Sequence, residues 1–192
     1  MINLIFGDCL EKLKDIESGS IDMILTDPPY NVDYQGGTGL QIMNDKQGDD
    51  DFYQFLYDFY TAQSTVCKKG GAWYVWHADS EGVNFRNAFE DAGLLMKQCL
   101  IWVKNALVMG RQDYQWKHEP CLYGWKPGAA HPWFGPFNDS TVLDFATKDL
   151  DTLSKTELVK IIETARESST IIREPRPRRN SEHPTMKPIN LI

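Results

Sequence analysis

The sequence lacks the features that mark membrane, secreted and metal-stabilised proteins. No apolar run approaches the 18 residues of a membrane-spanning helix, and the N-terminus has neither a basic segment nor a cleavage site. The four cysteines (Cys9, Cys67, Cys99, Cys121) form no C-x-x-C pair, and the four histidines show no ligand spacing. We therefore predict reduced, buried thiols, no structural metal and a cytoplasmic protein.

Positive charge is also scarce, and its distribution is uneven. The net charge is −7, but residues 1–96 hold 16 acids and 6 bases, whereas residues 97–192 hold 11 acids and 14 bases. The densest basic run, 173–179, is interrupted by prolines and is expected to be an extended loop. Composition alone leaves open whether these arginines meet phosphates or only keep the surface solvated.

The chain does contain enough apolar residues to form one sizeable core. Its 192 residues are 42% hydrophobic, and short continuous apolar runs alternate with helical patterns. This order predicts an α/β domain with buried, parallel strands. The predicted strands are 2–6, 21–26, 72–76, 94–103, 119–126, 141–145 and 170–172, and the predicted helices are 8–16, 49–69, 82–92 and 154–167.

The stretch Asp27-Pro28-Pro29-Tyr30 directly follows the strand predicted at 21–26. Two prolines cannot continue a ladder, because proline has no N–H and fixes its own φ. The four residues are therefore expected at the carboxyl end of a strand, where open α/β sheets bind ligands. The glycine-bearing segment 31–48 is predicted to be a mobile loop beside this site, and the mixed charged and aromatic segment from Asn105 to Glu119 is predicted to be an exposed functional loop.

Three pieces of sequence occur in a family-specific order. They are Gly7-Asp8-Cys9 ahead of Asp27-Pro28-Pro29-Tyr30, then 102–105 with His118-Glu119, and finally His183-Pro184-Thr185-Met186-Lys187-Pro188. In this order the chain resembles the permuted, beta-group, S-adenosylmethionine-dependent DNA amino-methyltransferases of restriction-modification systems, which act on adenine N6 or cytosine N4. The resemblance implies a Rossmann-like sheet with helices on both faces. It also implies a catalytic part at 1–104, target-recognition loops at 105–140 and a C-terminal part at 141–192.

The resemblance also implies roles for individual residues. Asp27, Pro28, Pro29 and Tyr30 would be catalytic: the Asp27 carboxylate and the Pro28 carbonyl accept the target amino group, and Tyr30 stacks on a flipped base. The implied cofactor-binding residues are Asp8, Cys9, Asp27, His183, Thr185 and Lys187. The implied contacts to duplex DNA are Tyr30, Lys104, Asn105, Arg111, His118, Arg176, Arg178 and Arg179.

Several of these residues also have plain structural explanations. Asp8 is equally well read as a helix N-cap, Pro184-Thr185 as a helix start, and Tyr30 as a ring packed under a loop. Each arginine or lysine alone is more often a solvated charge. Pro120-Cys121 does not fit a cytosine-C5 nucleophile, because Leu122 and a continuing strand pattern follow it.

The family pattern continues beyond H-P-T-x-K-P with a strand and a glycine-rich D-P-F-x-G-S-G turn, whereas this sequence ends at Ile192. Gly36-Gly37-Thr38-Gly39 does not replace that turn, because no strand precedes it and no helix follows. We therefore expect a sheet without its central C-terminal strand, and weak cofactor binding by this chain alone. We also expect an exposed apolar gap that a second copy or another polypeptide covers.

Aspartate at position 27 favours adenine N6 over cytosine N4, because the cytosine members more often carry serine there. The predicted function is thus a truncated or split adenine-N6 DNA methyltransferase using S-adenosylmethionine. Two alternatives stay open: methylation of cytosine N4 or an RNA amino group, and a non-catalytic DNA-binding remnant.

Overall fold

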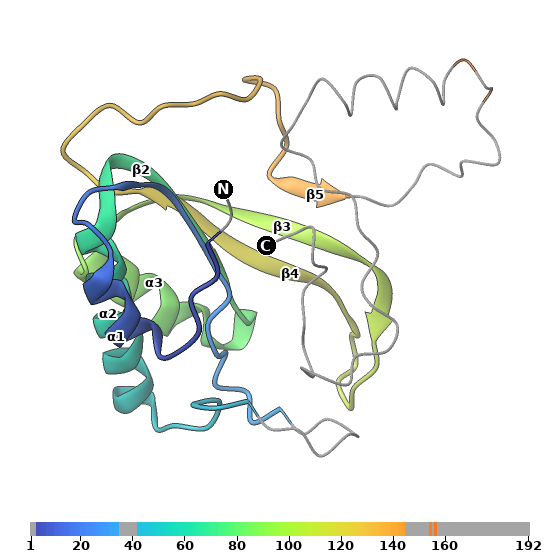
Figure 1. The fold of residues 1–192 in the computed structure, drawn as a ribbon. Coiled ribbons are helices and arrows are strands. Elements are labelled where there is room, and N and C mark those ends of the chain that lie inside the picture. The colour runs from blue at the N-terminus through green and yellow to red at the C-terminus, as the bar shows by residue number, and fades with distance from the viewer. Residues whose placement is uncertain (1–2, 35–41, 145–153, 155, 157–192) are drawn as a thin grey trace.

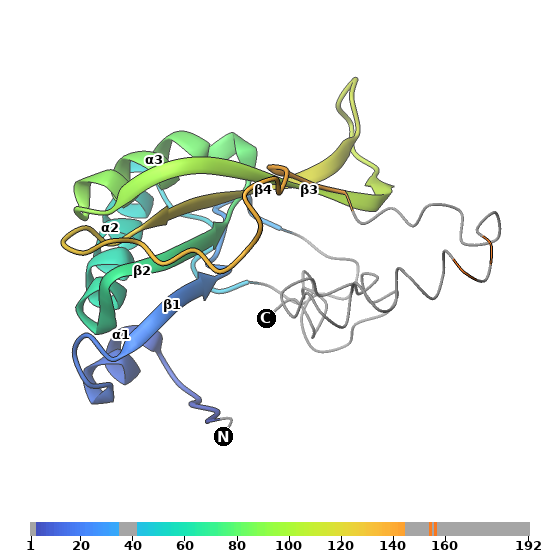
Figure 2. The ribbon, with the colours of Figure 1, turned by 90° about the horizontal axis from the view of Figure 1, so that it is seen from above.

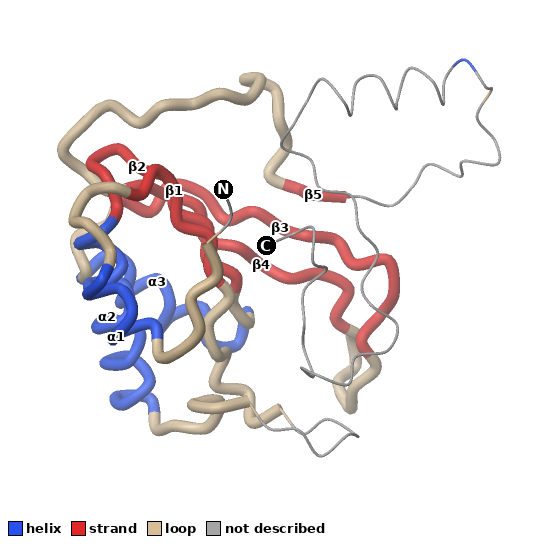
Figure 3. Tube along the Cα trace, viewed as in Figure 1, coloured by secondary structure: helices blue, strands red, loops and turns tan. Residues whose placement is uncertain are grey.

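The computed structural model describes residues 3–34, 42–144, 154 and 156. Figures 1 and 3 show a curved sheet with its helices gathered on one side. In chain order the elements are α1 (Cys9–Lys12), η1 (Leu13–Asp15), β1 (Ile21–Thr26), α2 (Asp49–Val66), β2 (Cys67–Trp76), η2 (Asp79–Glu81), α3 (Gly82–Asp91), β3 (Leu95–Val108), β4 (Trp116–Trp125) and β5 (Val142–Asp144).

The described strands form one mixed sheet in the order β1-β2-β4-β3-β5. β1 runs parallel to β2 and β5 runs parallel to β3, whereas β4 is antiparallel to both β2 and β3. The predicted parallel sheet is therefore wrong at β4. β3 and β4 are joined by a connection too short for a parallel crossover, so they form a hairpin.

That hairpin is longer than predicted. β3 continues through Asn105 to Val108, and β4 already begins at Trp116, inside the range predicted to be a loop. The ladder shifts register between Val103 and Val108, where β3 carries extra residues. The tip of the hairpin consequently projects beyond the rest of the sheet (Figure 2).

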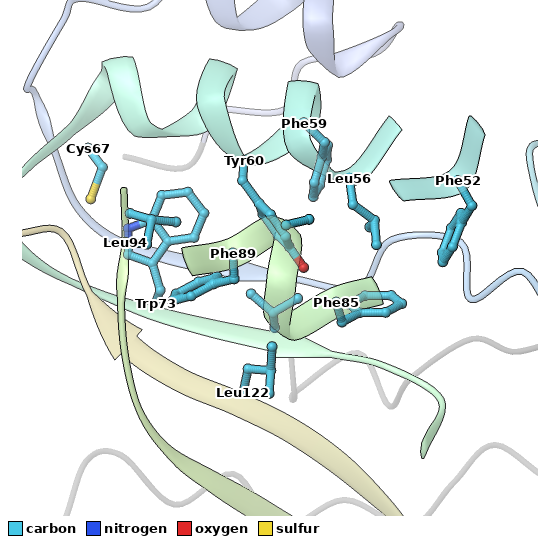
Figure 4. Close-up of a cluster of buried hydrophobic side chains, with 12 residues drawn as sticks. Phe52, Leu56, Phe59, Tyr60, Cys67, Trp73, Phe85, Phe89, Leu94 and Leu122 are labelled. Carbon is cyan, nitrogen blue, oxygen red and sulfur yellow. The ribbon is translucent and has the colours of Figure 1, made fainter. Parts of the chain in front are cut away.

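The main core lies between the sheet and the helices α2 and α3. Figure 4 shows side chains of both helices meeting strand residues over this face, among them Tyr60, Phe89 and Trp73. On the side of α2 that faces the sheet, Phe52, Leu56, Phe59 and Tyr60 are buried. The resemblance predicts helices on both faces of the sheet, and α2 and α3 supply the helices of this face. The opposite face carries a smaller cluster of Trp76, Trp102 and Cys121.

The strand predicted at 21–26 is confirmed with the same bounds as β1, but two other predictions at the N-terminal side are wrong. Residues 3–6 are not a strand, and Phe6 is fully exposed. β1 is not buried either: it lies at an edge of the described sheet, with Met23 51% and Leu25 37% exposed. The apolar residues at these positions are therefore not explained by a core within the described part.

The predicted end of α2 at Gly70-Gly71 is also wrong, because the helix ends at Val66 and β2 starts at Cys67. Gly70 has φ +81, and a Cβ there would lie 2.5 Å from the Ala130 carbonyl oxygen. At Gly71 a Cβ would lie 2.7 Å from Cys67 Sγ. These glycines therefore permit close backbone packing within a strand instead of capping a helix.

The other predictions have mixed outcomes. Strands 72–76 and 94–103, helix 82–92 and the short strand near 141–145 are confirmed, with Gly93 at φ +79 directly after α3. The predictions for 154–167 and 170–172 fall outside the described residues, apart from 154 and 156. Within the described part, no helix is long and apolar enough to cross a bilayer.

Candidate active site

Asp27-Pro28-Pro29-Tyr30 lies immediately after the last residue of β1, as predicted. Thr26 pairs with Val75 of the parallel strand β2, so the carboxyl ends of both strands meet at this edge of the sheet. Pro28 is buried, and Asp27 is exposed. The buried Pro28 therefore holds the tetrapeptide in place, and Asp27 presents its carboxylate to solvent.

Tyr30 turns its hydroxyl back to Asp27. Its Oη donates to Asp27 Oδ1 at 2.5 Å, and its ring meets Phe85 edge-on at 6.3 Å. The pKa of Tyr30 is raised well above its usual value, first by burial and then by the negative charges of Asp27 and Glu119. The hydroxyl therefore stays protonated and acts as a donor. The ring contacts both core clusters, so its predicted stacking on a base stays a prediction.

An ion pair between strands β3 and β4 of the hairpin lies beside Tyr30. Lys104 Nζ of β3 lies 3.3 Å from Glu119 Oε2 of β4, and the two side chains are only 16% and 13% exposed. Lys104 also lies 5.9 Å from the ring centre of Trp102. The structure therefore places Lys104 in an ion pair, and its predicted role in DNA contact stays a prediction. Sequence reasoning gave Glu119 no role, although His118-Glu119 was part of the family signature.

Asp45 was missed entirely. It is 4% exposed and accepts hydrogen bonds from the backbone N–H groups of Tyr30, Val32 and Tyr34. It lies within a segment read only as a glycine-bearing loop. No periodicity marks a buried aspartate in such a segment, so sequence patterns could not find it.

His77 follows the last residue of β2 and is 1% exposed. Its ring lies 5.2 Å from that of Phe85, which also contacts Tyr30. Burial lowers the pKa of His77 to about 4, so the imidazole is neutral at ordinary pH. It therefore forms part of the uncharged packing beneath the site.

The remaining predicted residues are spread over the molecule. Asp8 is the N-cap of α1, accepting from the Leu10 N–H at 2.9 Å, and Cys9 is exposed, contrary to its prediction as a buried thiol. Asn105 and Arg111 are exposed on the hairpin, and His118 lies 5.4 Å from the Trp116 ring. The predictions for His183, Thr185, Lys187, Arg176, Arg178 and Arg179 lie outside the described residues. The described part of the chain contains no cluster of metal-ligating side chains.

The sequence also matches known proteins. Residues 21–192 match the family N6_N4_Mtase, described as DNA methylase. The chain belongs to this DNA methylase family. DNA adenine methyltransferase YhdJ of Escherichia coli (strain K12) is 28% identical over 120 residues, covering 62% of this chain and 39% of that protein. The chain likewise spans about a third of two type II methyltransferases.

Two solved structures confirm the fold. The M1.HpyAVI-SAM complex aligns with a TM-score of 0.50 at 20% identity, covering 85% of this chain and 76% of that one. PvuII DNA methyltransferase (cytosine-N4-specific) aligns with a TM-score of 0.56 at 10% identity, covering 88% and 64%. The chain thus has the Rossmann-like methyltransferase fold, although its described part lacks a fully parallel arrangement.

Proposed function

We propose that this chain is the catalytic part of an S-adenosylmethionine-dependent DNA methyltransferase that modifies adenine N6 in the cytoplasm. The observation that carries the proposal is the exposed carboxylate of Asp27 at the end of β1, held by Tyr30 and anchored by the buried Pro28. Aspartate at this position and the adenine methyltransferase named among the relatives favour adenine.

The chemistry requires hydrogen-bond acceptors at the target nitrogen. The lone pair of an exocyclic amino group is delocalised into the base, so this nitrogen is a poor nucleophile. The Asp27 carboxylate and the Pro28 carbonyl each accept one N–H, which draws the nitrogen toward tetrahedral geometry and directs its lone pair outward. A carboxylate accepts several hydrogen bonds at once, so the bond from Tyr30 is compatible with this role.

The described residues fit the proposed cofactor through charge. S-adenosylmethionine, when bound, supplies an electrophilic methyl group on a positively charged sulfonium. Asp27 places a negative charge at the strand edge, and Asp8 is a second exposed acid, at the N-cap of α1. The neutral His77, which directly follows the neighbouring strand β2, adds no positive charge of its own. Cofactor contacts by His183, Thr185 and Lys187 stay proposals from the family motif.

The β3–β4 hairpin is the proposed DNA-contacting element. It is formed by the two strands that carry Lys104 and Glu119 beside Tyr30, and its tip projects outward (Figure 2). Arg111 and Lys117 are exposed there, as are Tyr114 at 92% and Met109 at 79%. Basic side chains bind phosphates, and exposed aromatic or apolar ones can pack against unstacked bases.

Methyl transfer tests the proposal directly. The full chain is incubated with labelled S-adenosylmethionine and random-sequence duplexes containing all four bases, with and without a fragment carrying a D-P-F-x-G-S-G loop, and the DNA is digested to identify the labelled nucleoside. We expect label on adenine N6, and a loss of at least about 100-fold in Asp27→Ala. Asp22→Ala, in the same strand but at its other end, is the matched control and should keep the wild-type rate.

The outcomes separate the candidate functions. Label on cytosine alone would replace adenine N6 by cytosine N4, the specificity stated for the PvuII methyltransferase. Retention of DNA without label in any combination would favour the non-catalytic remnant. The weak activity predicted for the chain without the added fragment is measured in the same experiment.

A further inference from the structure

Asp45 is a buried acid whose side-chain bonds all lead to the segment that begins at Tyr30. Its Oδ1 accepts from the backbone N–H groups of Tyr30 at 3.1 Å and Val32 at 3.3 Å, and its Oδ2 accepts from that of Tyr34 at 2.7 Å. No ion pair to Asp45 occurs within the described ranges. The bonds from this backbone segment therefore offset the cost of burying the charge.

The backbone is shaped to make these bonds converge. The donors come from alternate residues, and the residues between them, Asn31 and Asp33, have φ of 60° and 48°. Left-handed residues in alternation turn successive N–H groups to one side, which creates an anion-binding concavity. Here a side-chain carboxylate of the same chain occupies that concavity. Among residues other than glycine, Asn and Asp adopt such φ values most readily, and the bonds to Asp45 hold them here.

Further bonds fasten the same segment to the start of α2. Asn31 Oδ1 accepts from the Gln47 N–H at 2.6 Å, and the Asp33 N–H donates to the Asp45 carbonyl at 2.8 Å. α2 begins at Asp49, and its Phe52 packs 5.7 Å from Phe85, the ring that contacts Tyr30. Tyr30 is thus fixed through its backbone by Asp45 and through its ring by the core that α2 builds.

We propose that Asp45 is a positioning residue for methyl transfer. It holds the backbone that follows Asp27 to Tyr30 so that the Tyr30 hydroxyl and ring stay in register with the Asp27 carboxylate. A displacement of about 1 Å at a reacting centre can cost on the order of 100-fold in rate, so a rigid clamp here has catalytic value. This inference rests on the proposed function and adds a residue to its site.

The test replaces the carboxylate by its isostere in Asp45→Asn. The amide keeps the shape but turns one acceptor into a donor that faces backbone N–H groups, so the segment loosens. We expect kcat for methyl transfer to random-sequence duplex DNA to fall about 10- to 100-fold, with KM for S-adenosylmethionine changed less than about 2-fold. Hydrogen exchange in the peptide covering residues 30–34 should accelerate. Asp33→Asn, an exposed acid paired with Lys46 in the same segment, is the control and should stay within about 2-fold of wild type.

A second variant covers the case in which Asp45→Asn does not fold. Asn31→Gly relieves the left-handed backbone and removes both side-chain bonds to Gln47 without touching the buried carboxylate. It should accelerate exchange in the same peptide and lower kcat, again with little change in KM.

Three results would overturn the inference while leaving the proposed function standing. The first is a folded Asp45→Asn with wild-type kcat, whatever its melting temperature. The second is unchanged hydrogen exchange in the 30–34 peptide of Asp45→Asn. The third applies if Asp45→Asn does not fold, and is wild-type kcat in Asn31→Gly. Absence of transfer by the wild-type chain in every combination refutes the proposed function itself and the inference with it. That case is distinct, because wild type and variants then behave alike.

Discussion

At the scale of single residues, the site depends on groups whose charge state the fold has fixed. Tyr30 is held as a donor by burial and by two neighbouring acids, and His77 is held neutral chiefly by burial. A neutral imidazole that is 1% exposed and in contact with Phe85 behaves as an aromatic packing group. Protonation would place a poorly compensated charge in the core, which has a measurable consequence for stability.

We predict that His77 makes the protein less stable as the pH falls. Its pKa is lowered from 6.5 to about 4, so below pH 6.5 the unfolded chain binds a proton that the folded chain does not. Stability from this group is therefore complete above the unfolded pKa and declines between pH 6.5 and 4. Between pH 7.5 and 5.5 the free energy of unfolding should fall by about 1.3 kcal/mol from His77.

Urea denaturation at the two pH values measures this contribution. In His77→Gln the difference between pH 7.5 and 5.5 should shrink by that amount, even though the variant is less stable overall. Phe85→Leu, a neighbour that does not titrate, is the matched control and should leave the difference unchanged. An undiminished difference in His77→Gln would show that the imidazole is protonated in the folded state as readily as in the unfolded chain.

At the scale of elements, the β3–β4 hairpin determines how the site is built. It brings Glu119 and Lys104 beside Tyr30 and forms the antiparallel centre of the sheet. Close approach of these strands depends on Gly124 of β4. A Cβ there would overlap the Leu95 carbonyl oxygen and lie 3.1 Å from the Phe89 ring, so β4 and α3 meet over a glycine.

We predict that Gly124→Ala destabilises the fold by about 2 to 4 kcal/mol, because backbone atoms must separate to admit the methyl group. Gly48→Ala is the matched control. Gly48 has φ −66 and is the N-cap of α2, and a Cβ there would lie no closer than 3.9 Å to another atom, so only the less favourable alanine cap contributes and a change of at most about 1 kcal/mol is expected. Thermal or urea unfolding monitored by tryptophan fluorescence compares the two. Equal stability of both variants would contradict the packing argument.

The elements also show what the sequence could and could not predict. The helices α2 and α3 and the strand before Asp27 followed from periodicity and turn residues, because those signals are local. The antiparallel placement of β4 and the extension of β3 to Val108 depend on pairing between distant strands, which periodicity does not report. The tetrapeptide could be predicted because its motif is local in the sequence. The roles of Asp45 and Glu119 could not be predicted, because they arise only from tertiary contacts.

At the scale of the whole molecule, the sheet of the described residues ends at β1. This edge strand exposes Met23 at 51% and Leu25 at 37%, and these two alternate positions of the strand lie on one face. Exposed apolar residues on an edge strand favour pairing with another chain. The strand ends at Thr26, directly before Asp27, so a chain paired along it would reach the active site.

We therefore predict that the protein associates through β1, with a second copy of this chain as the partner. Sedimentation velocity should show a concentration-dependent shift from monomer toward dimer, and Met23→Lys should return the protein to a monomer because a charged side chain on an edge strand opposes pairing with another chain. Val83→Lys, at another exposed apolar position on α3, is the matched control and should not change association. A monomer at all concentrations, or an equal effect of both substitutions, would contradict pairing at β1. If Met23→Lys abolishes association and Val83→Lys does not, the partner chain pairs along β1, next to the Asp27 site.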